Sequence, residues 1–210
     1  MLEVITALYA SKHKWVARVM LWCAAAFILF YEILQFVKTG VMPIAFSTFS
    51  YFLFGIAVFL PLRPIKSAAA ICAFVSGLTY LSGFVFYPNA NYNAQPDEMK
   101  RMVGFLLHNL LLFGSLLLYG QYKVKKTDIF YAIGYFVFII VYTELAVRVF
   151  GNPHGNSLTL GVIEATLILQ IAPQFVIAWW WYILWYALVA VIFWGVWELT
   201  RFINRRLLRQ

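Results

Sequence analysis

Apolar residues fill this chain in long runs that short polar segments separate. Six runs reach the length of about 20 residues that a helix needs to cross the hydrocarbon core of a bilayer. They cover residues about 15–37, 41–62, 67–87, 102–121, 128–150 and 174–200. The pattern predicts an all-α fold, a polytopic membrane helical bundle of six transmembrane helices that forms one domain over residues 1–210.

Two shorter segments do not fit the spanning pattern. Segment 157–172 is apolar but short and carries Glu164, so we expect an interfacial or re-entrant piece. Residues 1–10 have an amphipathic pattern, and we expect them to lie along the inner leaflet. The first span is too long for the apolar core of a cleavable signal peptide, so we expect it to direct insertion itself.

Composition and charge exclude a soluble protein and set the orientation of the spans. The chain is 64% hydrophobic and only 11% charged, and its net charge of +8 comes from basic residues that flank the apolar runs. These residues do not form a stripe among stacking aromatics, so no nucleic acid is expected as a partner. With a cytoplasmic N-terminus, twelve basic residues lie inside (Lys12, Lys14, Arg18, Arg63, Lys66, Lys123, Lys125, Lys126, Arg201, Arg205, Arg206, Arg209) and four outside (Lys38, Lys100, Arg101, Arg148). This bias predicts a multi-pass protein of the cell membrane with both termini in the cytoplasm.

Five of the spans carry polar side chains at a similar depth. A helix rises about 1.5 Å per residue, so a residue six or seven positions from its outer end lies roughly 10 Å below the outer surface. Intramembrane Glu and His normally face a bundle interior or a wet cavity. The sequence therefore predicts a polar pocket open toward the outer leaflet, with these members: Glu32, Ser47, Thr48, Ser82, His108 and Glu144.

Helical spacing supports a shared interior face for this layer. Gly104, His108 and Ser115 fall on one face of the fourth span, where small residues let a neighbouring helix approach. A similar stripe in the second span consists of Pro43, Ser47, Ser50 and Tyr51. The aromatic run 178–186 is typical of a membrane interface, yet Trp181 and Tyr182 fall at the depth of the layer and are candidates for a pocket wall.

Each candidate also has a structural explanation. His108 is equally well explained as a core histidine bonded to a carbonyl or a serine. The Ser47 hydroxyl is equally suited to bond back to the Pro43 carbonyl one turn earlier. Glu144 precedes Arg148 by four residues, the spacing of a structural ion pair. Glu32 has no basic residue one turn away in its own span, and is the hardest of the four to explain structurally.

Metal and cofactor chemistry receive little support from the sequence. The three histidines, His13, His108 and His154, lack the local spacing of zinc ligands, although a site of Glu32, His108 and Glu144 is a minor alternative. Cys23 and Cys72 both fall in the inner halves of spans, where packing is the expected role. We expect no metal and no cofactor, and the sequence leaves the oligomeric state open.

Several short motifs resemble one known family. The motifs are Y-E-I-L-Q (31–35), M-P-I-A-F-S (42–47), His108 in F-L-L-H-N, N-P-H-G-N-S-L (152–158) and W-W-Y-I-L (180–184). Over residues 25–190 the chain resembles the YwaF-like family of bacterial membrane proteins. That family is similar to a eukaryotic membrane acyltransferase for phospholipids and, more distantly, to androgen-induced-gene-type lipid hydrolases.

The resemblance implies a lipid acyltransferase or lipid-ester hydrolase. Pro43 matches the proline of the family's nucleophile motif and His108 its membrane histidine, the base. Ser47 stands where the family has a cysteine, and the chain lacks the family's first span. Because of these two departures, a catalytically inactive member of the family is an alternative interpretation. The substrate implied is a membrane lipid or small hydrophobic molecule.

The expected mechanism assigns a role to each candidate. Ser47, or Thr48 as second choice, attacks the ester carbonyl while His108 takes its proton. Glu32 or Glu144 orients the imidazole ring, and Asn109 or a tryptophan N–H stabilises the oxyanion. Ser50, Ser82, Trp181 and Tyr182 complete the substrate-binding set.

Two other classes of protein fit the same sequence. A small-molecule binding or transport subunit, of the substrate-binding type found in energy-coupling transporters, shares the length, the six spans and the internal termini. Such a subunit needs a helix face that binds its partner module. The small residues Ala24 to Ala26 are the candidate for that face. The third class is a structural or assembly partner with an incidental polar layer.

Overall fold

The computed structural model describes residue 5 and residues 14–40, 46–86, 98–150 and 179–208. Within these ranges the regular elements are helices: α2 (Lys14–Thr39), α3 (Phe46–Phe59), α4 (Arg63–Phe86), α6 (Glu98–Tyr119), α7 (Asp128–Phe150) and α10 (Trp179–Leu208). The predicted all-α class is confirmed for the described chain. Segment 157–172 and the amphipathic pattern of residues 1–10 lie outside these ranges, apart from Ile5.

Three of the described helices are long and apolar enough to cross a membrane. They are α2, the Arg63–Ser82 part of α4, and α6, while Phe46–Phe59 and Asp128–Tyr142 are shorter apolar helices. Length and apolar composition of this kind support insertion into a bilayer. The structure is therefore that of a helical membrane protein.

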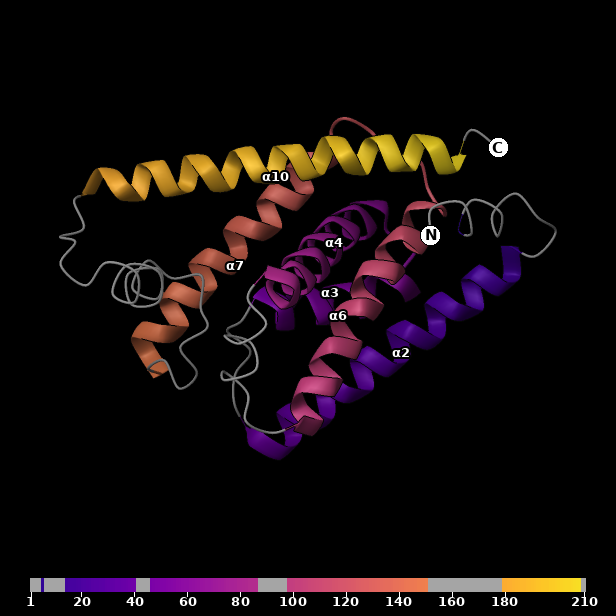
Figure 1. Ribbon diagram of the computed structural model, residues 1–210, viewed down its shortest axis with the longest axis horizontal. Coiled ribbons are helices and arrows are strands. Elements are labelled where there is room, and N and C mark those ends of the chain that lie inside the picture. Colours follow the sequence, from indigo (N-terminus) through magenta and orange to yellow (C-terminus); the bar gives the residue numbers. More distant parts are fainter. Residues whose placement is uncertain (1–4, 6–13, 41–45, 87–97, 151–178, 209–210) are drawn as a thin grey trace.

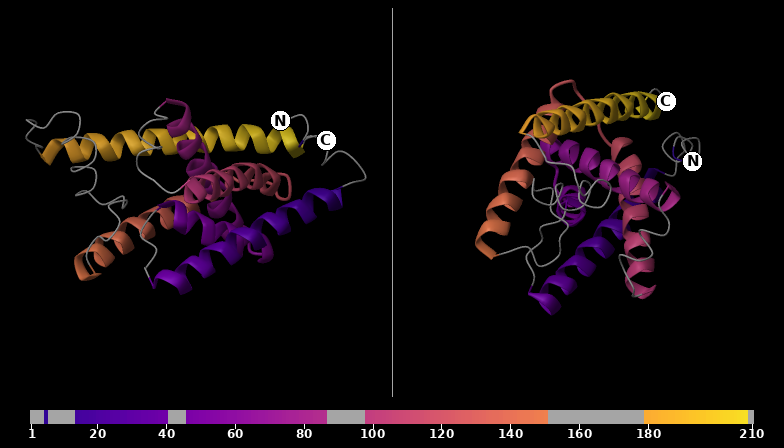
Figure 2. Two further views of the ribbon diagram at one scale, coloured as in Figure 1. Left: turned by 60° about the horizontal axis from the view of Figure 1, so that its bottom comes forward. Right: turned by 60° about the vertical axis from the view of Figure 1, so that its left-hand side comes forward.

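Helix α4 occupies the centre of the bundle. It packs most extensively against α6 and also contacts α3 and α7, while α2 packs on α3 and α6. Figure 1 shows α7 on one side of this centre and α2 on the other, with α10 running across the top. In both figures the start of α2 and the end of α10 lie toward the same side of the molecule (Figure 2).

Glycine and proline set the ends of α2 and α3. Gly40 has a φ of 63°, and its N–H donates to the Phe36 carbonyl at 2.8 Å. This left-handed cap is a conformation that glycine adopts without strain. Helix α3 ends at Phe59, two residues before Pro61, because proline has no N–H to continue the helix. The predicted run 41–62 therefore extends three residues beyond the helix, and its first five residues lie outside the described chain.

Three other helices extend beyond the apolar runs that predicted them. Helix α4 begins at Arg63 instead of about 67, because Pro64 suits a first turn that needs no N–H there. Helix α6 begins at Glu98 instead of about 102, since a carboxylate in the first turn favours the positive end of the helix dipole. Helix α10 continues to Leu208 instead of about 200, with Arg205 and Arg206 in its last turn. Hydrophobicity marks the spanning part of a helix but not its polar turns.

The distribution of side chains by size suits a lipid environment. The consecutive residues Ser67 to Ala73 on α4 are all buried, and most of them are small. Large apolar side chains such as Phe30, Phe130 and Trp194 are more than 60% exposed. Small residues inside allow α4 to approach three neighbours closely, and the apolar exterior is satisfied by lipid chains.

Glycine brings two helices together beside the polar cluster. A Cβ atom added at Gly77 of α4 would lie 2.8 Å from the carbonyl oxygen of His108 and 2.9 Å from the backbone nitrogen of Leu112. These atoms belong to the backbone of α6, so a larger residue would have to separate the helices. The absence of a side chain at Gly77 therefore fixes the position of His108 against α4.

Candidate functional site

A buried polar cluster lies where α2, α3, α4 and α6 meet. His108 of α6 is 7% exposed, Tyr51 of α3 is 4% exposed and Glu32 of α2 is 8% exposed. Tyr80 of α4 is partly buried and contributes a fourth ring. We call these four residues the His108 cluster. Of the predicted polar layer, Glu32 and His108 are thus confirmed as interior residues.

The hydrogen bonds of His108 define its neutral form. Its Nδ1 lies 2.7 Å from the Gly104 carbonyl oxygen, and the Tyr51 hydroxyl lies 2.7 Å from Nδ1 and 3.1 Å from Nε2. A carbonyl can only accept, so in the neutral ring Nδ1 carries the proton and donates it to Gly104. With the proton on Nδ1, the Tyr51 oxygen can accept from Nδ1–H at 2.7 Å, and the Nε2 lone pair is left to accept the Tyr51 hydroxyl proton at the longer distance of 3.1 Å. This is the protonation pattern of a general base that faces a hydroxyl.

Aromatic rings hold the imidazole in place. The Tyr80 ring stacks on His108 with centroids 3.6 Å apart and an interplanar angle of 6°, while Tyr51 meets it edge-on at 5.3 Å and 71°. The stacking and the bond to Gly104 together restrict both rotation and tilt of the ring. In this geometry Tyr80 and Gly104 hold the ring, and the orienting role expected of Glu32 or Glu144 stays a prediction.

Glu32 lies beside Tyr51 within the same cluster. The carboxyl of Glu32 and the hydroxyls of Tyr31 and Tyr80 are the ionisable neighbours that influence the Tyr51 hydroxyl electrostatically. No Lys or Arg is among them. The cluster thus places a buried carboxyl near a phenol that is itself bonded to an imidazole.

The hydroxyls of the second predicted span have different surroundings. Ser47 and Thr48 are partly buried on α3, and within the described chain the hydrogen bonds of His108 go to Tyr51 and Gly104, not to Ser47. Ser50 is fully buried, and its hydroxyl donates to the Phe46 carbonyl at 2.8 Å. This back-bonding was the structural alternative considered for Ser47, and at Ser50 it occupies the hydroxyl.

Two other predicted members bond to their own helices. The Asn109 amide donates to the Phe105 carbonyl at 2.8 Å, and the Ser82 hydroxyl donates to the Thr79 carbonyl at 2.8 Å. Both contacts lie at the exposed surface of their helices. In this geometry neither polar group points into the His108 cluster.

Three predicted residues cannot be placed by side chain. Glu144 belongs to α7, and Trp181 and Tyr182 belong to α10, but their side chains lie outside the described part of the structure. Their roles remain predictions. Among the described residues, no group of three His, Cys, Asp or Glu side chains is arranged to hold a metal ion.

Sequence reasoning missed the tyrosines that surround His108. Tyr51 was expected only as a member of a helical stripe, and Tyr80 was not considered. One signal was available, because a buried histidine needs partners and tyrosine is the common aromatic residue that can also bond. Since the chain has 13 tyrosines, the signal could not single out these two without the helix packing.

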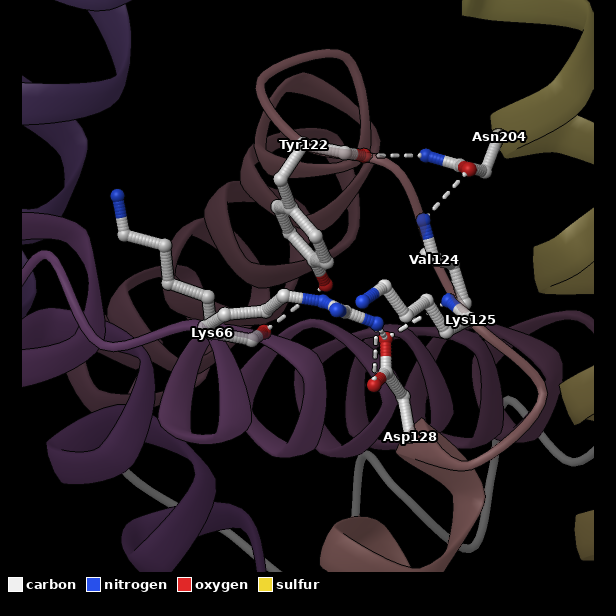
Figure 3. A network of polar contacts seen from close by, with 7 residues as sticks. Lys66, Tyr122, Val124, Lys125, Asp128 and Asn204 are labelled. Atoms are coloured by element: carbon white, nitrogen blue, oxygen red, sulfur yellow. Dashed lines mark hydrogen bonds and ion pairs between the residues drawn. The ribbon is translucent and has the colours of Figure 1, made fainter.

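A second polar network lies at the end of the bundle where α4 begins (Figure 3). Arg63 binds both carboxylate oxygens of Asp128, at 2.6 and 2.7 Å, and the same carboxylate accepts the Lys125 backbone N–H at 2.9 Å. The Tyr122 hydroxyl donates to the Lys66 carbonyl at 3.2 Å. Burial raises the pKa of the Tyr122 phenol above its ordinary value, so the group stays protonated and able to donate.

Asn204 of α10 joins this network to the loop between α6 and α7. Its amide nitrogen donates to the carbonyls of Tyr119 and Tyr122, at 2.6 and 2.8 Å, and its amide oxygen accepts the Val124 N–H at 3.0 Å. In Figure 3 Asn204 lies above the loop and meets it from the side of α10. Three hydrogen bonds from one amide fix the path of the loop.

Comparisons with protein-family models, with curated proteins and with solved structures find no match for this chain. The chemistry of the His108 cluster is therefore the basis on which a function can be argued.

Proposed function

We propose that this protein crosses the membrane six times, with both termini in the cytoplasm, and transfers or hydrolyses a lipid acyl ester at the His108 cluster. Support for the orientation comes from the twelve basic residues on one side against four on the other. The start of α2 and the end of α10 lie on the same side of the molecule, which agrees with an even number of spans.

One observation carries the chemical part of the proposal. His108 is buried, its Nδ1–H is bonded to the Gly104 carbonyl, and its Nε2 faces a hydroxyl from a neighbouring helix. A base oriented by one partner and facing a hydroxyl with the other nitrogen is the arrangement that activates weak oxygen nucleophiles. The resemblance to the YwaF-like family assigns the role of base to the same histidine.

Two hydroxyls on α3 are candidates for the group that His108 activates. Tyr51 is in contact with the ring, and Ser47 precedes it by four residues on the same helical face. Side chains of a helix lean toward its N-terminus, so the Tyr51 ring extends over the turn that holds Ser47. We assign Ser47 as the nucleophile, Tyr51 as the hydroxyl that passes its proton, and Nε2 of His108 as the acceptor.

The reaction is balanced in two steps. The Ser47 oxygen attacks the ester carbonyl, its proton passes through Tyr51 to His108, and the lipid alcohol leaves with the proton that His108 returns. In the second step water, or the hydroxyl of a lysolipid, attacks the acyl-serine and gives its proton to His108. The bond between the acyl carbon and the Ser47 oxygen breaks, and His108 returns the proton to that oxygen. The acyl group is thereby released as an acid or transferred to a new lipid.

The test is turnover of a labelled phospholipid by the purified protein in nanodiscs. We expect His108→Ala and Ser47→Ala each to lower acyl release or transfer by about 100-fold or more, because a base and its nucleophile act as one unit. Tyr51→Phe should lower it comparably while leaving Ser47 in place. Fluorophosphonate should label Ser47 in the unsubstituted protein and fail to label it in His108→Ala.

Ser82→Ala is the matched control, because this serine is bonded to its own helix away from the cluster. Activity should be retained in this variant. Turnover that survives His108→Ala, or an unsubstituted protein with neither turnover nor labelling, would refute the enzymatic proposal.

A second candidate function is a binding or transport subunit for a small molecule. The aromatic enclosure of His108 by Tyr51 and Tyr80 favours it, since such rings often line recognition sites. A thermal-shift screen against vitamins and phospholipids separates the two candidates. Stabilisation by a vitamin, without turnover of any lipid, would favour binding.

A further inference from the structure

Five cations gather around the loop between α6 and α7 and at the start of α4. Lys123, Lys125 and Lys126 are exposed on this loop, and Arg63 and Lys66 lie in the first turn of α4. Asp128 is the carboxylate that meets them, and Arg63 binds it. Among the described residues, none of the four lysines pairs with a carboxylate. The site therefore has a strong positive excess.

The site is held in a fixed shape before any ligand binds. Asn204 holds the loop through Tyr119, Tyr122 and Val124, and the Tyr122 hydroxyl ties the loop to α4. In Figure 3 the side chain of Lys125 extends back toward the Tyr122 hydroxyl. Fixed cations lose less conformational entropy on binding than those of a free tail, so this arrangement favours a specific ligand.

A buried donor without a partner points to the chemistry of that ligand. The Nε of Arg63 is buried and has no hydrogen-bond partner among the described residues. The Ser67 hydroxyl, only 1% exposed, interacts instead with the Tyr122 phenol. An unsatisfied buried donor is costly, and Arg63 lies at a helix N-terminus, where the dipole favours negative charge. The missing partner of Arg63 is an oxygen acceptor that carries negative charge.

We propose that this site binds the phosphate of an anionic membrane lipid. Phosphate supplies several acceptor oxygens to Arg63 and to the exposed lysines of the loop at once. Phe59 and Leu62, next to the site, are 52% and 50% exposed and offer apolar contact for the acyl chains of the same molecule. A free phosphate ion would leave this apolar surface unused. The proposal is independent of the chemistry assigned to His108.

The experiment measures binding of phosphatidylglycerol and of phosphatidylcholine to the full-length protein in detergent, by native mass spectrometry and thermal shift. We expect a clear preference for phosphatidylglycerol. The double variant Lys123→Gln/Lys125→Gln should weaken the binding of phosphatidylglycerol by about 25-fold. Each lysine near an anionic lipid contributes about fivefold to the affinity, and the two effects multiply.

The matched control is Lys14→Gln/Arg18→Gln, which removes two exposed cations from the start of α2 and lowers the net charge equally. Phosphatidylglycerol binding by this control should stay within about twofold of the unsubstituted protein, because salt screens the attraction of exposed charges that lie away from the site. An equal loss in the control would show nonspecific attraction and overturn the proposal. Stabilisation by inorganic phosphate as strong as that by phosphatidylglycerol would also overturn it, since the lipid would then be unnecessary.

Discussion

His108 is an ionisable residue inside an apolar bundle, where its ring nitrogens need hydrogen-bond partners. It has one acceptor on its own helix, the Gly104 carbonyl, and one hydroxyl from α3, that of Tyr51. Neither partner carries a full charge. The ring therefore remains a base whose lone pair is directed at a single hydroxyl, which is the property that the proposed reaction needs.

Tyr51→Phe should destabilise the protein by about 1 kcal/mol, because Nε2 of His108 loses its donor while the ring packing remains. The free energy of unfolding is measured by titration with sodium dodecyl sulfate in mixed micelles. Tyr131→Phe is the control, since Tyr131 is 47% exposed on α7. Equal effects of the two substitutions would mean that the Tyr51 contact contributes nothing.

At the scale of helices, the close approach of α4 and α6 positions the site. Ser67 to Ala73 and Gly77 present little bulk to the neighbouring helices, and the backbone of His108 lies directly against Gly77. Without this approach, the Tyr80 ring could not stack on the imidazole at 3.6 Å. The packing of small residues is thus a condition for the chemistry.

Gly77→Ala tests this condition. The added Cβ would meet backbone atoms of α6, so we expect a loss of about 1–3 kcal/mol in the free energy of unfolding, together with impaired function of His108. Gly134→Ala on α7 is the matched control, because its Cβ would meet nothing within 4 Å. The control should be neutral or stabilised, since alanine favours helix by about 1 kcal/mol. A Gly77→Ala protein as stable as the control would contradict the packing argument.

The position of each helix could be predicted from its apolar run, but the ends of the helices could not. The apolar runs located every helix of the described chain, because lipid imposes a minimum length that no soluble context requires. The polar first turns at Arg63 and Glu98 were missed, since hydropathy does not register caps. Ala24 to Ala26 were considered only as a face for a partner module, and the buried small residues Ala68 to Ala70 of α4 were not singled out.

The candidate site was only partly predictable for a related reason. Depth along a helix placed Glu32 and His108 in one layer, and both are buried. Rotation about each helix axis, and the tilt between helices, decide which layer members meet. Tyr51 and Tyr80 contact His108 because of the rotation and tilt of their helices, and both depend on packing between distant segments of the chain.

For the whole molecule, the strongest prediction concerns its orientation in the membrane. With Cys23 and Cys72 replaced by serine and alanine, a cysteine at Glu98 should react with an impermeant maleimide added outside intact cells. A cysteine at Lys125 should react only after the membrane is opened, because the basic ends remain in the cytoplasm. Glu98 and Lys125 are both exposed in the structure, so burial does not explain a difference. The opposite labelling pattern would reverse the proposed topology.

The Asn204 contacts have a consequence for how the protein is made. This amide lies 80 residues after Val124 in the chain, yet it completes the hydrogen bonds of a loop that leaves the ribosome much earlier. Until α10 has entered the membrane, the loop lacks the partner that fixes its path. A nascent chain therefore acquires its finished basic surface only after α10 has been made, and a product terminated before α10 would expose an unsecured loop to proteases.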